Sequence, residues 1–170
     1  VPASAGRFDI RPALCYAGER KGGIGMDLDG KFSPPRLAFC TRRDPSGAEF
    51  VLLDTGDDLL PPSRAVEDRT GYEAVLNHVH LFSGPFPPEE LAEVRPRALA
   101  AAQDLRHALE QTFPDKRFAV FLTLNPEDGI LRFHQLWPGE VPYYQVSGTV
   151  ERDADALHTD IYAFYTGGAG

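Results

Sequence analysis

The chain has 170 residues and a formal net charge of −8, with 17 Lys and Arg against 25 Asp and Glu. This acidic balance excludes nucleic acid and membranes from the expected partners, because both present a phosphate-rich, negatively charged surface. A length of 170 residues is typical of one domain, and a hydrophobic content of 42% is sufficient for a core. We therefore expect residues 1–170 to form a single acidic domain.

The first part of the chain predicts a hairpin and a long strand. Residues 1–35 indicate an irregular N-terminal segment. Residues 36–42 and 49–54 are β-like runs joined by DPSG, which has the residue preferences of a type I turn. A polar loop at 55–70 follows, and the run YEAVLNHVHLF at 72–82 favours a strand through its β-branched and aromatic residues.

One long helix is predicted over residues 86–114. Apolar residues recur there at spacings of three and four, which is the period of one helix face. Pro87 and Pro88 are start signals and Pro114 is a stop signal. Pro96 removes a helical hydrogen bond, so we expect a kink, or a first turn at 88–94 and a main helix at 96–112.

The remainder of the chain predicts a C-terminal meander over residues 117–165. Its expected strands are 118–124, 130–137, 143–150 and 157–165. Connections this short favour antiparallel neighbours. The predicted fold class is therefore α+β, with an antiparallel β-sheet of about six to seven strands packed on one long central helix.

Cysteine content and hydropathy bear on the compartment. Cys15 and Cys40 lack the spacing of a metal site, so buried reduced thiols are the first interpretation and one disulfide is the alternative. No apolar run reaches the roughly 18 residues that a membrane span requires. We expect a cytoplasmic protein, although a start at Val1 leaves open whether a signal segment preceded it.

A first chemical hypothesis comes from Asp54-Thr55-Gly56. The apolar run at 51–53 followed by Asp-Thr-Gly resembles the active-site turn of the retroviral-type aspartic proteases. That resemblance implies a homodimer in which two Asp54 carboxylates share one proton and activate a water molecule. The sequence departs from the family at Asp57, where a small residue is expected. The structural alternative is that Asp54 and Gly56 form the turn that ends a strand.

A second hypothesis concerns three histidines. His78 and His80 are two residues apart, so in a strand they project from the same face. His134, on a later strand, would add a third ligand for a divalent metal if the strands were neighbours. The alternative is that these histidines are ordinary surface or half-buried residues.

A third hypothesis rests on the aromatic residues of the C-terminal meander. Aromatic side chains with polar groups are common in binding surfaces and ligand pockets. The candidate ligand-binding residues are Arg132, His134, Trp137, Tyr144 and Tyr162. The alternative is an aromatic core between sheet and helix.

These observations favour a non-catalytic binding module that uses an aromatic sheet face or a pocket between sheet and helix. The expected partner is another protein, for which a basic surface would suit the acidic chain, or a small-molecule ligand. No cofactor is expected, with a divalent metal as the alternative. The alternative function is a hydrolase, either metal-dependent through His78, His80 and His134 or protease-like through Asp54.

Overall fold

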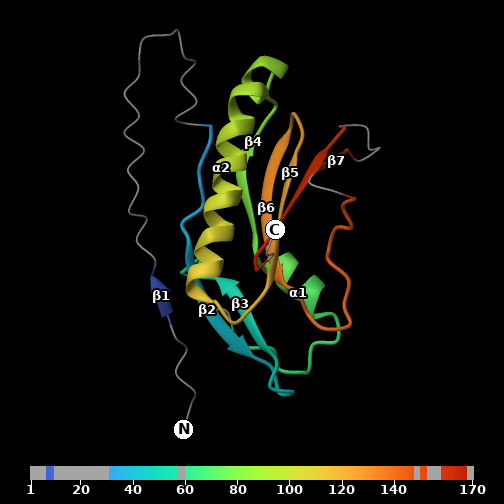
Figure 1. Ribbon diagram of the computed structural model, residues 1–170. Coiled ribbons are helices and arrows are strands. Elements are labelled where there is room, and N and C mark those ends of the chain that lie inside the picture. The colour runs from blue at the N-terminus through green and yellow to red at the C-terminus, as the bar shows by residue number, and fades with distance from the viewer. Residues whose placement is uncertain (1–6, 10–30, 57–59, 148–149, 153–157, 168–170) are drawn as a thin grey trace.

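The computed structural model describes residues 7–9, 31–56, 60–147, 150–152 and 158–167 (Figure 1). Most of the predicted irregular segment at 1–35 lies outside the described residues. Within them, the elements in chain order are β1 (Arg7–Asp9), β2 (Ala38–Arg43), β3 (Glu49–Leu53), α1 (Arg69–Leu76), β4 (His78–Ser83), α2 (Pro88–Thr112), β5 (Phe118–Leu124), β6 (Asp128–Gln135), β7 (Val150–Arg152) and β8 (Asp160–Tyr165).

The fold is α+β with antiparallel sheets and one long helix, as predicted, but the strands form two sheets rather than one. Among the described residues, one sheet has the order β1-β2-β3 and the other has the order β4-β6-β5-β8-β7. The β2–β3 hairpin is confirmed, with the Gly47 amide donating to the Asp44 carbonyl at 3.0 Å. Gly47 takes a φ of 88°, a conformation that glycine adopts without strain.

The C-terminal half is not a sequential meander. β4 occupies the outer edge of β6, so β8 pairs with the other side of the β5–β6 hairpin, next to β5. The predicted strand at 143–150 is also wrong, because residues 143–147 are irregular and β7 covers only Val150–Arg152. β5 is confirmed as a central strand, and all of its residues are buried.

The predicted strand at 72–82 is instead a helix followed by a strand. α1 begins after Asp68, whose carboxylate accepts the Gly71 amide at 2.8 Å and so caps the helix N-terminus. α1 buries Glu73 and Ala74 against the rest of the molecule, and β4 begins one residue after the Asn77 cap. Tertiary contacts of one helix face therefore override the β-propensity of this run.

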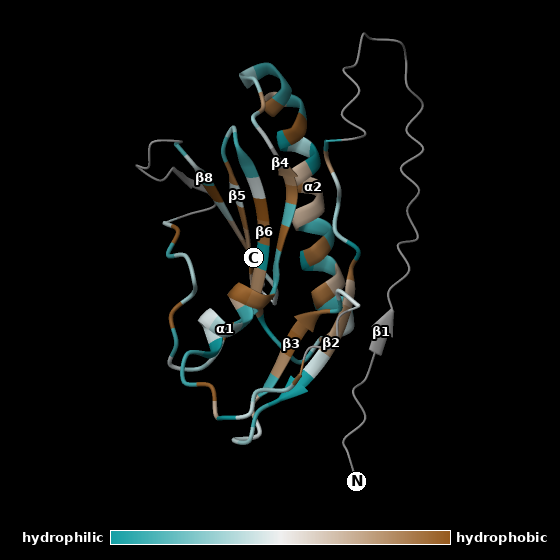
Figure 2. Ribbon diagram, turned by 180° about the vertical axis from the view of Figure 1, so that it is seen from behind, coloured by the Kyte–Doolittle hydropathy of each residue, from teal (hydrophilic) through white to brown (hydrophobic). Residues whose placement is uncertain are grey.

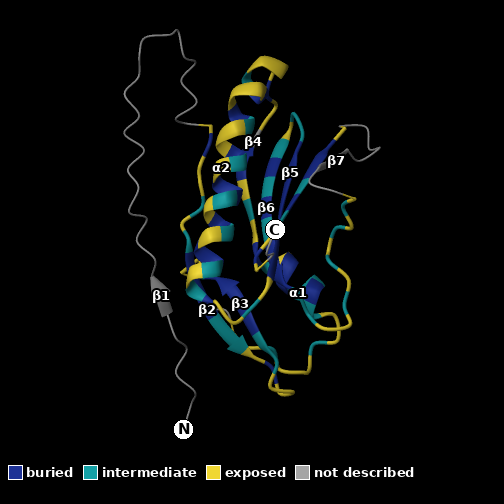
Figure 3. Cartoon of the chain, viewed as in Figure 1, coloured by how far each residue is buried: buried dark blue, intermediate teal, exposed yellow. Residues whose placement is uncertain are grey.

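α2 runs without a break from Pro88 to Thr112, so the predicted division into a first turn at 88–94 and a main helix at 96–112 is wrong, and the alternative of a kink at Pro96 stays a prediction. Pro96 lies on the exposed side of α2, and the residues that follow it in the helix pack on the sheet. Ala98, Ala102 and Leu105 are fully or almost fully buried, and the small alanines allow a close approach between helix and sheet. The outer side of α2 is exposed (Figure 3).

A single large core connects α2 with both sheets. It includes Phe39 of β2, Val51 of β3, Leu122 of β5 and Phe133 of β6. Hydrophobic residues accordingly follow β3, β5 and β6 and one side of α2 (Figure 2). Packed side chains fill the space between α2 and the five-stranded sheet, so α2 covers one face of that sheet. The opposite face is left for other contacts. No helix among the described residues is both long and apolar enough to cross a membrane.

Candidate functional site on the outer sheet face

The face of the five-stranded sheet that is turned away from α2, called here the outer face, carries most of the polar candidates. Strand register places His78, Arg132, Phe121 and Ala163 in one row across β4, β6, β5 and β8. Neighbouring rows begin at His80 and at His134. Side chains alternate between faces along a strand, so these residues share one surface although they are far apart in sequence.

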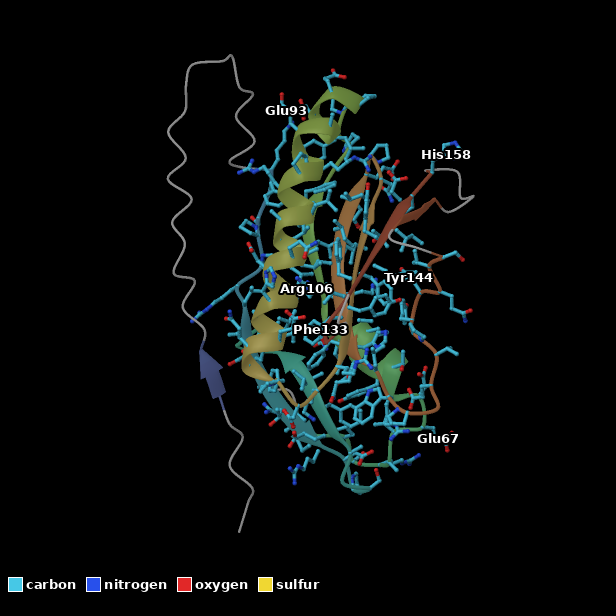
Figure 4. All side chains as sticks on the ribbon, in the orientation of Figure 1. Glu67, Glu93, Arg106, Phe133, Tyr144 and His158 are labelled. Carbon is cyan, nitrogen blue, oxygen red and sulfur yellow. The ribbon has the colours of Figure 1, made fainter. Side chains whose placement is uncertain are left out.

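Residues 136–147, called here the strap, cross part of this outer face. The partly buried Leu136, Tyr144 and Val146 pack against a small apolar cluster that includes Phe121. The Tyr144 and Phe121 rings meet edge to face with centroids 5.4 Å apart. Figure 4 shows Tyr144 on the side of the strands opposite α2. The strap therefore covers the apolar part of the outer face and places its aromatic side chains beside Arg132.

Arg132 occupies the centre of this arrangement. Its guanidinium carbon lies 4.9 Å from the Tyr143 ring centroid and 5.9 Å from that of Tyr144, which are cation–π distances. Its Nη1 donates to the Ala74 carbonyl at 3.2 Å. Its Nε is closed off from solvent and has no hydrogen-bond partner among the described residues. Two rings and one carbonyl thus hold the cation in a fixed position.

His134 attaches the strap to the sheet. Its Nε2 accepts the Tyr143 backbone amide at 3.1 Å, so Nδ1 carries the proton and donates to the Gln135 carbonyl at 2.7 Å. The side chain is completely buried, and this burial lowers the pKa of His134. The neutral tautomer uses both nitrogens within the protein. His134 therefore has a structural role beneath Tyr143.

The structure does not bring the three predicted metal ligands together. His78 and His80 are exposed on β4, with ring centroids 5.6 Å apart, whereas both nitrogens of His134 are already engaged. The described part of the chain holds no group of three His, Cys, Asp or Glu side chains that could bind a metal ion. His134 is therefore not available as a third ligand beside His78 and His80.

The predicted aromatic ligand site divides among three places. Arg132, His134 and Tyr144 come together on the outer face. Tyr162 faces α2 instead, where Arg95 donates to its hydroxyl and also pairs with Asp160 at 2.6 Å. That pairing raises the pKa of Arg95. The sequence could not separate these positions, because register decides which face each aromatic residue occupies.

Trp137 lies at the junction of the two sheets. Its ring packs on Phe50, with centroids 5.5 Å apart, and lies 4.8 Å from the Arg69 guanidinium. Its Nε1 donates to Glu73 Oε2 at 3.1 Å. Glu140 fixes the strap near the same place by accepting from Arg69 Nε at 2.7 Å and from the Thr70 amide at 2.8 Å. Trp137 therefore belongs to a structural junction.

Glu73 is the centre of that junction, a role that no motif or periodicity of the sequence indicates. Its completely buried carboxylate accepts four N–H groups, from the Val51 amide, the Gln135 amide, Gln135 Nε2 and Trp137 Nε1. Burial raises the pKa of Glu73, and the hydrogen bonds from Gln135, Val51 and Trp137 oppose that shift. All four partners are donors, so they match an ionised, acceptor-only carboxylate.

Asn77, one helical turn after Glu73, adds further hydrogen bonds to β3. Its Oδ1 accepts the Leu53 amide at 2.9 Å, and its Nδ2 donates to the Val51 carbonyl at 2.9 Å. Gln135 Nε2 also donates to the Glu49 carbonyl at 2.8 Å. The outward backbone groups of β3 are therefore satisfied by side chains instead of another strand. This arrangement connects the two sheets and satisfies polar groups that would otherwise be buried without partners.

Asp54 forms a turn at the end of β3. Its Oδ1 accepts the Gly56 amide at 3.0 Å, and Gly56 has a φ of 86°. This local bond corresponds to the turn that we considered as the structural alternative. A pairing of two Asp54 carboxylates across a dimer stays a prediction.

Exposed apolar residues occur on α1 and in the strap, the two segments that contact Arg132. Val75, Val141 and Tyr143 expose 55%, 65% and 40% of their surface. Val75 follows Ala74, whose carbonyl accepts a hydrogen bond from Arg132. The ring of Tyr143 lies against the Arg132 guanidinium. Val75 and Tyr143 were not among the predicted ligand-binding residues, because exposure next to Arg132 depends on α1 and on the strap, neither of which was predicted. Asp68 three residues before Gly71 is a capping signal that could have indicated α1.

Comparisons with protein-family models, with curated proteins and with solved structures found no significant match to this chain.

Proposed function

We propose that this protein is a non-catalytic binding module that binds a protein partner through the outer face. The binding patch consists of Val75, Arg132, Val141 and Tyr143. The observation that carries the proposal is an arginine held against two tyrosine rings, with exposed apolar side chains on the same helix and strap that hold it. Arg and Tyr are enriched among the residues that dominate binding energy, especially where their conformations are already fixed.

The packing of α2 favours this face over a pocket between sheet and helix. The inner face is occupied by buried phenylalanine and leucine side chains, and Tyr162 is engaged by Arg95. On the outer face, Val75 and Val141 offer apolar contact area, and Arg132 supplies a cation. A partner segment with an apolar anchor and an adjacent carboxylate fits this chemistry, because guanidinium and carboxylate form strong charge-assisted hydrogen bonds.

The test selects peptides from a random library for binding to the immobilised full chain. The soluble Tyr143→Ser variant is present as a competitor, so that peptides that bind elsewhere on the protein are removed. An enriched synthetic peptide is then titrated into labelled protein and followed by NMR chemical shifts. We expect the largest shifts at Val75, Arg132, Val141 and Tyr143, and a loss of affinity of at least tenfold in Tyr143→Ser.

The matched control is Gln111→Ser, which changes an exposed residue of α2 on the other side of the sheet. This variant should keep the affinity of the parent chain. Shifts that cluster on α2, or equal affinity for the parent chain and Tyr143→Ser, would contradict the proposal. Circular dichroism of each variant establishes that the fold is retained.

A further inference from the structure

His78 and His80 form a pair whose geometry resembles two ligands of one metal ion. Both lie on β4, an edge strand of the five-stranded sheet, and both side chains are exposed. Their ring centroids are 5.6 Å apart. Two imidazoles on one tetrahedral ion, with metal–nitrogen distances of about 2.0–2.1 Å, have centroids roughly 5–5.5 Å apart. The pair is therefore within a few tenths of an ångström of the required spacing.

Each ring is anchored through Nδ1 to an acceptor of the protein. His78 Nδ1 lies 2.6 Å from the Val75 carbonyl oxygen, and His80 Nδ1 lies 2.9 Å from Asp128 Oδ1. A carbonyl and a carboxylate can only accept, so both neutral rings carry the proton on Nδ1. Their Nε2 atoms then hold lone pairs. Metal-binding histidines show the same pattern, in which the second nitrogen donates to a carbonyl or carboxylate that orients the ring.

The acceptors of the two rings lie on opposite sides of the pair along β4. Val75 precedes His78 in the chain, whereas Asp128 is the register partner of Ser83, beyond His80. The Nδ1 edges of the two rings are thus drawn toward opposite ends of β4. Because Nε2 lies on the ring edge away from Nδ1, this anchoring favours Nε2 atoms that face the space between the rings.

We propose that His78 and His80 bind one divalent transition-metal ion through their Nε2 atoms. Two imidazoles select borderline ions such as Zn²⁺, Ni²⁺ and Cu²⁺, whereas Ca²⁺ and Mg²⁺ require oxygen ligands. The described residues supply two ligands, so water or another molecule completes the coordination of the ion. Such an open site binds and exchanges its ion readily, unlike a closed structural site with four protein ligands.

The charges around the pair define its preferences further. Asp128 is the only charged side chain bonded to either ring among the described residues, and its negative charge favours a cation. Arg132 is the register partner of His78 and opposes the cation, although its guanidinium is turned toward Ala74 and the tyrosines. A bound ion beside Arg132 therefore favours an anionic ligand, such as a carboxylate, at the open positions.

The experiment is a calorimetric titration of the tag-free, metal-free full chain with Zn²⁺ and with Ni²⁺ at pH 8. We expect one ion per chain with a Kd below about 1 mM. His78→Ala and His80→Ala should each weaken binding at least tenfold. Asp128→Asn should weaken it by about 10-fold or more, which is the effect typical of a lost orienting partner.

Controls separate this pair from the other histidines. A double variant, His107→Ala with His158→Ala, changes two exposed histidines and should bind with unchanged affinity. NMR of the ring nitrogens should show that Zn²⁺ shifts Nε2 of His78 and His80 and leaves His134 unchanged. Absence of binding up to about 1 mM, or equal binding in His78→Ala and the parent chain, would overturn the proposal. Since His78 and His80 are exposed, their alanine variants should fold normally, which thermal unfolding verifies.

Discussion

Replacement of Glu73 by Gln should destabilise the protein strongly, although the two side chains have nearly the same shape. Glu73 Oε1 accepts two N–H groups at 2.8 and 2.7 Å, and Oε2 accepts two more at 2.6 and 3.1 Å. In Glu73→Gln, one oxygen becomes an NH₂ group, so two buried donors lose their acceptor whichever way the amide turns. Each unsatisfied buried donor costs about 1–3 kcal/mol.

The neutral amide is easier to bury than a carboxylate, and this offsets part of the loss. We therefore expect a decrease of about 2–4 kcal/mol in the free energy of unfolding. For a chain of this length, that decrease corresponds to a fall in Tm of about 5–15 °C. Urea unfolding at pH 8 measures it by circular dichroism and by the emission of Trp137, the only tryptophan of the chain, whose indole donates to Glu73.

Glu67→Gln is the matched control, because Glu67 is exposed and lies shortly before α1. Its free energy of unfolding should stay within about 0.5 kcal/mol of the parent value, as is usual for surface substitutions. If Glu73→Gln were equally neutral, the view that this carboxylate connects the two sheets would be refuted. A blue or red shift of Trp137 emission in native Glu73→Gln would report the altered indole environment directly.

Two further predictions test the helix packing and the strap. Ala102→Leu should lower stability by about 1–3 kcal/mol through overpacking against the sheet, whereas Ala100→Leu on the exposed side of α2 should be near neutral in the same urea assay. Burial lowers the pKa of His134 below the ordinary histidine value of about 6.5, so the unfolded chain binds the proton more readily than the native chain. The stability that neutral His134 contributes is therefore complete above pH 6.5 and is lost as the pH falls toward the lowered native pKa. The urea midpoints of the parent chain and of His134→Gln should therefore come closer together as the pH is lowered from 8 to 5. A difference in midpoint that stays constant over this range would contradict the structural role of neutral His134.

Local signals in the sequence were sufficient for the elements that depend on nearest neighbours. The DPSG run predicted the β2–β3 hairpin, since turn preferences act over four residues. The apolar period from Leu91 to Leu105 predicted α2, and the nearly continuous apolar run of β5 predicted a strand buried on both faces. Pro96 does not divide the helix, because a proline on the exposed side of a long packed helix is compensated by the contacts of the opposite side.

The candidate site depended on contacts that the sequence does not encode locally. The run at 72–82 has strong β-propensity, yet its first half is helical because Glu73 and Asn77, four residues apart, reach β3 and β6 from one helix face. The position of His134 on the same face as His78 followed from register. Its burial followed from the strap, which no periodicity predicts, so its nitrogens were unavailable for a metal.

The sequence by itself therefore determined the class of the fold, the long helix, the central strand and the projection of His78 and His80 from the same face of a strand. These properties arise from period, turn chemistry and side-chain alternation within short windows. Only the tertiary structure decided that the strands form two sheets, that Tyr162 and Arg132 lie on opposite faces, and that Asp128 orients His80. The physical reason is that strand order, register and strap position depend on buried contacts between residues far apart in the chain, as in the bond between Gln135 and Glu49, which are 86 positions apart.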